Sequence, residues 1–248
     1  MSTTGRYMEK LDAIAPKHIH PHAAQVVDRR VQTLDMRKML PWVKGPQVLE
    51  MGYGDGMWTS EIVDRFGHTH IVDGSSVLLD HVRELHGEKQ VTVFHNLFEE
   101  FTPPPGLRFD TIVATHVLEH VDEPVAILRR AHGWLNSGGR ILIIVPNATS
   151  LHRQLAVIMG IQETVHDFSP RDHEVGHQRV YDLGMLRKDV AEAGYRVLLE
   201  RGLFLKTLPN GMMVDFSDSL LAAMVDISDG LPTEWMANLA MVIEPMAH

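Results

Sequence analysis

Apolar and polar positions along the chain alternate between the patterns of short strands and of amphipathic helices. Short runs of aliphatic and β-branched residues predict strands at residues 47–51, 70–73, 92–95, 111–114 and 140–145. Between them, apolar residues recur at helical spacing over residues 58–66, 76–86 and 124–135. Strands that alternate with helices in this way predict an α/β fold built on a doubly wound, mostly parallel sheet.

The segments on either side of this alternation predict further elements. Helical patterns precede it at residues 7–14 and 23–40, and residues 183–193, 195–205, 212–228 and 238–244 predict a helix, a strand, a helix and a last strand after it. We therefore divide the chain into an N-terminal helical lid (1–44), a core (45–147), a substrate cap with a helix (148–194) and C-terminal strands and helix that complete the sheet (195–248).

Composition narrows the class of protein. The chain has 248 residues, a formal net charge of −9 and no cysteine, which excludes disulfides, thiolate catalysis and zinc–thiolate sites. No apolar run is long enough for a membrane span, and no block of lysine and arginine predicts a nucleic-acid surface. We expect a cytoplasmic enzyme that acts on a small molecule, with a homodimer as a possible assembly.

Residues 48–56, with the sequence Val-Leu-Glu-Met-Gly-Tyr-Gly-Asp-Gly, carry the most informative motif. An apolar strand ends near an acid, and a turn with glycine at every second position follows. The next predicted strand ends in Asp73. A strand, a glycine turn, a helix and a second strand that ends in a carboxylate are typical of a nucleoside site, because the glycines admit the ligand and the carboxylate accepts ribose hydroxyls.

The glycine spacing favours a cationic cofactor over a dinucleotide. A dinucleotide site has Gly-x-Gly-x-x-Gly and presents a helix N-terminus to a pyrophosphate. This chain has Gly52, Gly54 and Gly56, with Glu50 two residues earlier. That acid would repel a pyrophosphate and attract a cation. An NAD(P)-dependent oxidoreductase and a non-catalytic cofactor-binding protein stay open as alternatives.

An apolar strand, an acid and Gly-x-Gly-x-Gly resemble the first motif of the class I S-adenosylmethionine-dependent methyltransferases. Later motifs keep that family's order: a strand from Asp110 followed by Leu118-Glu119-His120, then a Gly138-Gly139 turn before the next strand. The resemblance covers about residues 45–147 and is to small-molecule methyltransferases of the secondary-metabolite and quinone type. By this resemblance, Glu119 and His120 support the cofactor loop.

The resemblance implies a Rossmann-like, seven-stranded sheet with an antiparallel last strand, and S-adenosyl-L-methionine as the cofactor. Glu50 would face the charged methionine part, Asp73 would hold the ribose, and Asn96 would stand where the family usually has an aspartate beside the adenine. The predicted cofactor-binding residues are Glu50, Gly52, Tyr53, Gly54, Gly56, Asp73, Gly74, Asn96, Leu97, Phe98, Thr115 and His116.

A histidine-rich segment, residues 167–181, is the predicted source of acceptor chemistry. His173 and His177 are four residues apart, so they would share one face if the segment were helical. A neutral imidazole has a pKa suited to taking a proton near pH 7, so both are predicted to act as a general base or to orient the substrate. A solvated, hydrogen-bonded loop is the alternative.

The same segment also has the His-Glu-x-x-His pattern of zinc proteases. No third ligand is evident and the other motifs follow the methyltransferase order, so we expect no metal site. Tyr7, Phe168, Arg171 and Met212 are predicted to contact the acceptor. The predicted function is in-line methyl transfer to an oxygen, a nitrogen or a nucleophilic carbon of a small molecule, assisted by a histidine base.

Overall fold

The computed structural model describes residues 3–19 and 23–246. Its strands are β1 (Val48–Met51), β2 (Thr69–Asp73), β3 (Val91–His95), β4 (Phe109–Thr115), β5 (Leu135–Pro146), β6 (Tyr195–Leu203) and β7 (Asn238–Pro245). Its α-helices are α1 (Thr3–Ile19), α2 (Ala23–Met39), α3 (Met57–Phe66), α4 (Ser76–His86), α5 (Pro124–His132), α6 (Leu151–Ile158), α7 (Pro170–Val175), α8 (Leu183–Glu192) and α9 (Asp218–Asp226). None of the helices in these ranges is long and apolar enough to cross a membrane.

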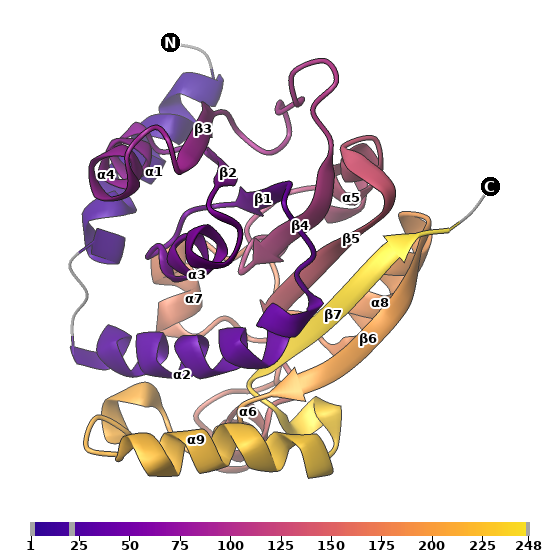
Figure 1. Ribbon diagram of the computed structural model, residues 1–248. Coiled ribbons are helices and arrows are strands. Elements are labelled where there is room, and N and C mark those ends of the chain that lie inside the picture. The colour runs from indigo at the N-terminus through magenta and orange to yellow at the C-terminus, as the bar shows by residue number, and fades with distance from the viewer. Residues whose placement is uncertain (1–2, 20–22, 247–248) are drawn as a thin grey trace.

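The strands form one seven-stranded sheet in the order β3-β2-β1-β4-β5-β7-β6 (Figure 1). Strands β1 to β5 pair in parallel, and β7 runs antiparallel to both β5 and β6. The predicted α/β fold with an antiparallel last strand is confirmed. The strand order reverses between β1 and β4, and ligands of open α/β sheets bind at the carboxyl ends of strands at such a switch point.

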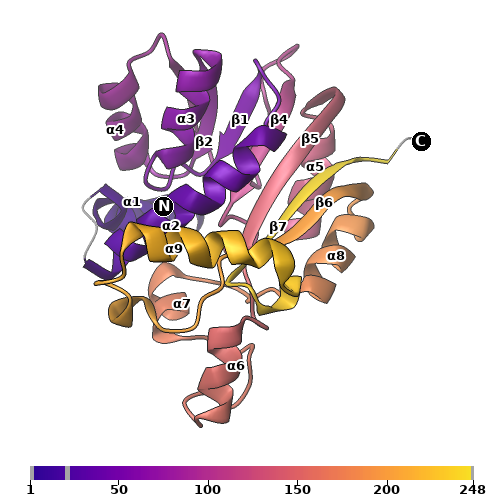
Figure 2. The same cartoon turned by 60° about the horizontal axis from the view of Figure 1, so that its bottom comes forward.

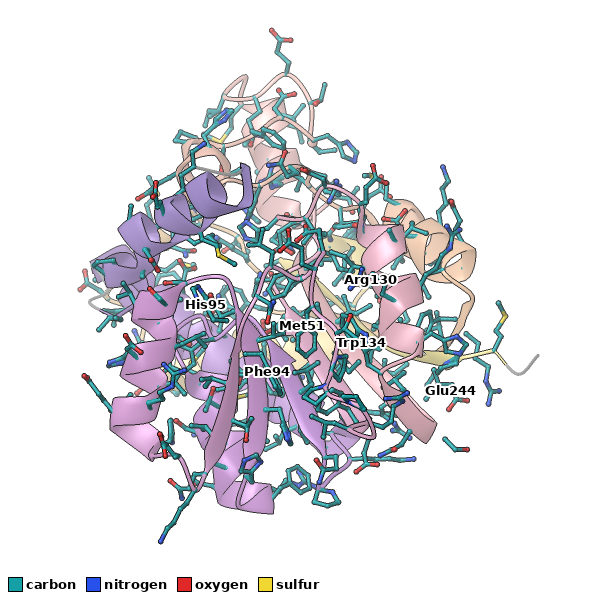
Figure 3. The ribbon with its side chains drawn as sticks, turned by 90° about the horizontal axis from the view of Figure 1, so that it is seen from above. Met51, Phe94, His95, Arg130, Trp134 and Glu244 are labelled. Atoms are coloured by element: carbon teal, nitrogen blue, oxygen red, sulfur yellow. The ribbon has the colours of Figure 1, made fainter. Side chains whose placement is uncertain are left out.

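Both faces of the sheet are covered, so its central strands are apolar on both sides. In β5, Ile141 and Ile143 pack with α5 and α8, whereas Leu142 and Ile144 pack with α2 and α3. An aromatic group extends the first of these layers: the ring centroid of Phe101 lies 5.1 Å from those of Phe94 and Trp134, both labelled in Figure 3. Burial on both faces explains why the strands appear in the sequence as continuous apolar runs.

The N-terminal helix α1 is docked on the start of α4, beside the end of β2. Asp12 of α1 accepts hydrogen bonds from the hydroxyls of Ser75 (2.7 Å) and Ser76 (3.0 Å). Carboxylates are favoured at a helix N-terminus, where backbone N–H groups lack partners within the helix. Helix α1 therefore lies over the turn that follows Asp73.

Residues 204–237, which connect β6 to β7 along the chain, form a second covering element. Its helix α9 runs alongside α2, as Figures 1 and 2 both show. Apolar contacts join the two helices, and Arg30 of α2 forms an ion pair with Asp218 at 2.6 Å. The pattern predicted one helix over 212–228. That prediction is wrong at its start, because Ser217 caps α9 by accepting a hydrogen bond from the Leu220 amide.

The helix predicted over residues 124–135 also ends early, at His132. Leu135 is the first residue of β5 and pairs with Phe109, so the last apolar position of the predicted helix belongs to the strand. The cap segment between β5 and α8 contains α6 and α7, and α6 projects from the body of the molecule in Figure 2.

Gly202 in β6 gives a test of how tightly the C-terminal strands pack. A Cβ at this position would contact the Met236 side chain and lie 2.7 Å from the Thr233 carbonyl oxygen. We expect Gly202→Ala to lower the free energy of unfolding by about 1–3 kcal/mol, because backbone lies against the added methyl. Gly211→Ala, whose methyl would meet open space, is the matched control. Equal melting temperatures of the two variants would contradict this packing.

Candidate active site

A cavity of about 750 Å³ opens at the carboxyl ends of the central strands. Helices α1 and α2, the turn after β1 and helix α7 contribute to its wall. Small-molecule sites have volumes of about 300–1,000 Å³, so the cavity has the size of such a site. The predicted cofactor residues that line it are Glu50, Gly52, Tyr53, Gly54, Asp73, Gly74, Leu97, Phe98, Thr115 and His116.

The glycine turn after β1 adopts a backbone that side chains disfavour. Gly52, Gly54 and Gly56 have φ angles of 77°, 58° and 76°, in the left-handed region where glycine has no steric cost. A Cβ on Gly54 would meet nothing within 4 Å, so that residue leaves space on the cavity side. Gly56 does not line the cavity and instead precedes α3 as its N-cap.

Asp73 holds two parts of the site together. Its Oδ2 accepts a hydrogen bond from the Tyr53 amide (2.9 Å) and its Oδ1 accepts one from the Ser75 amide (2.7 Å). The carboxylate is 7% exposed and lines the cavity. A carboxylate only accepts hydrogen bonds, so its place on the cavity wall suits a ligand that carries hydroxyl donors.

Glu50 is a buried acid at the end of β1. Burial, reinforced by the nearby charges of Asp55 and Asp73, raises the pKa of Glu50 to about 8, although Thr59 donates a hydrogen bond of 2.5 Å to its carboxylate. A buried carboxylate is stabilised as the ion when a cation binds beside it. Glu50 therefore suits a positively charged ligand.

The carboxyl end of β4 leads into a pair formed by the partly exposed His116 and the buried Glu119. His116 has a φ of 55°, an uncommon value for a residue other than glycine. Its Nδ1 lies 3.1 Å from Oε1 of Glu119. Burial alone would lower the pKa of His116, but the hydrogen bond and charge of Glu119 and the charge of Asp35 outweigh it and raise that pKa.

Asp35 is a cavity residue that the sequence interpretation missed. It is 2% exposed, and burial raises its pKa to about 7 although Asn238 donates a hydrogen bond to it. Its Oδ1 has no hydrogen-bond partner within the described part of the chain. A signal was present: Asp35 interrupts the i, i+4 row of Val27, Val31 and Met39, all buried.

The histidine-rich segment is only partly helical. Helix α7 ends at Val175, and Gly176 has a left-handed φ of 79°. The condition for a shared face was a helix that runs through both His173 and His177, and this condition is not met. His173 lies on the exposed side of α7, whereas His177 turns inward and its Nδ1 donates a hydrogen bond to Asp172 Oδ1 at 2.7 Å.

The other predicted site residues divide by position. Arg171, His173 and His177 line the cavity. Phe168 packs its ring against His173 and Met212 is 68% exposed, and neither lines the cavity. The side chain of Asn96 is also absent from its wall.

The predicted contact of Tyr7 with the acceptor falls on a side chain outside those that the structure describes. Its backbone belongs to α1.

The family model described as a methyltransferase domain matches residues 10–200, more than half of the chain. The chain belongs to this methyltransferase family. The resemblance to class I S-adenosylmethionine-dependent methyltransferases that the glycine motif indicated is thereby confirmed, and neither an oxidoreductase nor a non-catalytic protein is favoured.

Curated relatives match about half of the methyltransferase. It is 29% identical over 119 residues to the ubiquinone biosynthesis O-methyltransferase of Xylella fastidiosa (strain 9a5c), an alignment that covers 47% of this chain and 48% of the relative. The protein of the same name from Xanthomonas oryzae pv. oryzae (strain PXO99A) is 32% identical over 117 residues, or 46% of this chain and 48% of the relative. The chain thus spans about half the length of the curated relatives it matches.

Solved structures establish the shared fold over most of the methyltransferase. The CcbJ methyltransferase from Streptomyces caelestis has a TM-score of 0.64 at 16% identity and covers 95% of this chain and 97% of its own. An S-adenosylmethionine-dependent methyltransferase from Mesorhizobium loti has a TM-score of 0.63 at 15% identity, with coverages of 88% and 99%.

The methyltransferase cavity has features that fit S-adenosylmethionine. Gly54 leaves room for a ligand against the backbone, Asp73 places a carboxylate acceptor that suits ribose hydroxyls on the cavity wall, and Glu50 is a buried acid that suits a cationic group. Leu97 and Phe98 supply apolar surface for the adenine ring. The residues present therefore fit the family's cofactor.

Proposed function

We propose that the protein transfers the methyl group of S-adenosylmethionine to a small-molecule acceptor bound in the same cavity. The observation that carries this proposal is the cavity that joins Glu50, Gly54 and Asp73 to the wall formed by α7 and the end of β4. It brings predicted cofactor residues and predicted acceptor residues into one enclosure. The relative from Xylella fastidiosa is named as an O-methyltransferase of ubiquinone biosynthesis, which supports a small organic acceptor.

When bound, the cofactor supplies an electrophilic methyl carbon on a sulfonium. The acceptor forms a bond to that carbon as the carbon–sulfur bond breaks, and S-adenosylhomocysteine leaves. This displacement needs close, collinear approach of the acceptor atom and the methyl carbon, and binding of both molecules in one enclosure would favour it. Where the acceptor atom is an oxygen or a nitrogen, its proton must also pass to a base.

We assign the base to His173. A base must reach the proton that it takes, and His173 is an exposed side chain on the cavity wall. His177 is only 9% exposed at its side chain and is held by Asp172, so proton transfer to the acceptor is not assigned to it. Arg171, which also lines the cavity and pairs with Glu174 at 3.1 Å, would orient the acceptor.

A structure of the 1,6-didemethyltoxoflavin-N1-methyltransferase from Burkholderia thailandensis, with 1,6-didemethyltoxoflavin and S-adenosylhomocysteine bound, shares the fold. Its TM-score is 0.60 at 13% identity, and the match covers all of this chain and 92% of its own. The small molecule bound in that protein supports a small organic acceptor here.

The proposal is tested by incubating the protein with methyl-labelled S-adenosylmethionine and a metabolite extract. We expect label in a small molecule, identified by mass spectrometry. Once the acceptor is known, His173→Ala should lower kcat by about 10²–10⁴-fold, the usual contribution of a general base, with cofactor affinity unchanged. His166→Ala is the matched control, since His166 is an exposed imidazole that does not line the cavity. Full turnover by His173→Ala would remove His173 as the base.

A further inference from the structure

Three potential metal ligands meet beside the cavity, from two separate parts of the chain. Glu119 and His120 follow β4, and His177 follows α7. Each offers one ligand atom, and these atoms lie within 4.8 Å of one another. The imidazole centroids of His120 and His177 are 4.7 Å apart. This cluster shares His177 with the His173–His177 pair that the sequence pattern indicated, but it does not include His173.

Glu119 has one carboxylate oxygen engaged and one available. Its Oε1 lies 3.1 Å from His116 Nδ1. Its Oε2 is buried, and no partner for it is found in the residues described. A buried carboxylate oxygen without a hydrogen bond is costly, and a bound cation would satisfy it. This orphaned oxygen is independent of the clustering of the three side chains.

Both histidines are also held on one side. His177 Nδ1 is 2.7 Å from Asp172 Oδ1, which leaves Nε2 available. His120 hydrogen-bonds the backbone of Gly176. Metal-binding histidines nearly always use their second nitrogen in this way, with a carboxylate or a backbone carbonyl as the outer partner.

The outer partner of His177 is itself fixed. Arg153 donates a hydrogen bond of 2.6 Å to Asp172 Oδ2, and the amide and hydroxyl of Ser169 each lie 2.7 Å from the same oxygen. Asp172 is 4% exposed. The His177 ring is therefore oriented by a buried network before any ligand arrives.

We propose that Glu119, His120 and His177 bind one divalent first-row transition-metal ion at the wall of the cavity. Two imidazoles and one carboxylate suit Zn²⁺, Mn²⁺, Fe²⁺ or Co²⁺, whereas Mg²⁺ and Ca²⁺ favour sites made of oxygen ligands. Metal–ligand bonds of about 2.0–2.2 Å require the three atoms to close in by about 1 Å, which side-chain rotation supplies.

Three protein ligands leave coordination positions open, and both histidines line the cavity. On the proposed function, those positions would receive an oxygen or nitrogen donor of the acceptor. The ion would then orient that donor and lower its pKa. This step rests on the proposed function, but metal binding itself does not.

The test uses the full-length protein, stripped with a chelator and titrated with Zn²⁺ by calorimetry and with Co²⁺ by visible absorption. We expect one equivalent to bind, with Co²⁺ ligand-field bands. His120→Gln and His177→Gln should each weaken that binding by about 100-fold or more, since even outer-partner changes cost about 10–100-fold. Glu119→Gln should act in the same direction, and Asp172→Asn should weaken binding within the 10–100-fold range.

His173→Gln is the matched control, because it removes a neighbouring cap histidine outside the cluster. This variant should still bind one equivalent of the metal ion. Loss in His173→Gln without loss in His120→Gln would place the ion in the His-Glu-x-x-His pattern and overturn the proposal. Weak binding of several ions that is unchanged in all variants would also overturn the proposal. It would show that the ions bind to some of the 16 histidines at the surface.

S-Adenosylhomocysteine binding is measured on the same samples. Variants that bind it like the parent are folded, so their loss of metal is local. Failure to bind S-adenosylhomocysteine in the parent protein would count against the proposed function, whereas absence of a metal equivalent with intact S-adenosylhomocysteine binding would overturn the metal site alone.

Discussion

Replacing Asp73 with alanine is expected to weaken the binding of S-adenosylhomocysteine by at least about 100-fold. Hydrogen bonds to a charged group contribute about 1.5–3 kcal/mol each, and two ribose hydroxyls would be lost as donors to this carboxylate. The substitution also removes the acceptor of the Tyr53 and Ser75 amides. Those amides fix the glycine turn and the start of α4, so the empty site would also lose its preorganised shape.

Isothermal titration calorimetry measures this effect directly. Asp73→Asn keeps the size of the side chain and one acceptor oxygen, so its loss of affinity should lie between those of the parent and Asp73→Ala. Asp64→Ala, which removes an exposed carboxylate from α3, is the matched control and should bind like the parent. Parent-like affinity in Asp73→Ala would show that the ribose is held elsewhere.

The sheet was predictable from the sequence because its strands are buried on both faces. Residues such as Ile141 to Val145 must all be apolar to lie between two helical layers, and this continuous run predicts a strand in a parallel sheet. The turn after β1 was predictable for a related reason. Gly52 and Gly54 adopt left-handed φ angles, so glycine is the residue with least strain at both positions.

The acceptor side of the cavity was less predictable, because it is built from contacts between distant segments. The four-residue spacing of His173 and His177 would place them on one helix face only if the helix continued, and Gly176 ends α7 between them. His177 then packs against His120, which lies far away in the sequence. Local spacing contains no information about such a meeting.

Asp35 shows a different limit. Its place on the apolar row of α2 marks it as unusual, yet the row alone cannot show that Asn238 and the cavity lie opposite. The residues at the switch point of the sheet could be predicted because each belongs to a short contiguous motif at the end of a strand. Residues supplied by α2, α7 and the segment after β6 depend on how those elements close over the sheet.

Glu50→Gln is expected to stabilise the protein without ligand at high pH. The pKa of Glu50 is about 8 in the folded protein, above its ordinary value of 4.5. Because the folded-state pKa is raised, the contribution of Glu50 to stability is fully present below pH 4.5 and is lost as pH rises through 8. Glutamine does not ionise, so its folded state escapes this loss.

The melting temperatures of the parent and Glu50→Gln should therefore be similar near pH 4.5 and separate as pH rises toward 9, with the variant higher. A pKa shift of one unit corresponds to about 1.4 kcal/mol, so the difference in unfolding free energy above pH 8 should reach a few kcal/mol. Glu84→Gln, at an exposed position of α4, should follow the parent at every pH. A constant difference across the pH range would contradict a raised pKa.

The affinity for the cofactor should change with pH in the opposite direction to the stability of the parent protein. Affinity should rise with pH, because ionised Glu50 holds a cation best. If only the ionised form binds, the affinity of the parent for S-adenosylmethionine should rise by up to about 50-fold between pH 6 and pH 8, as the carboxyl loses its proton. Glu50→Gln should bind more weakly at pH 8 and lose this pH dependence. One substitution thus raises stability and lowers affinity, as expected when burial of an acid is retained for a charged ligand. Tight, pH-independent binding by the variant would instead assign recognition of the cation to other residues.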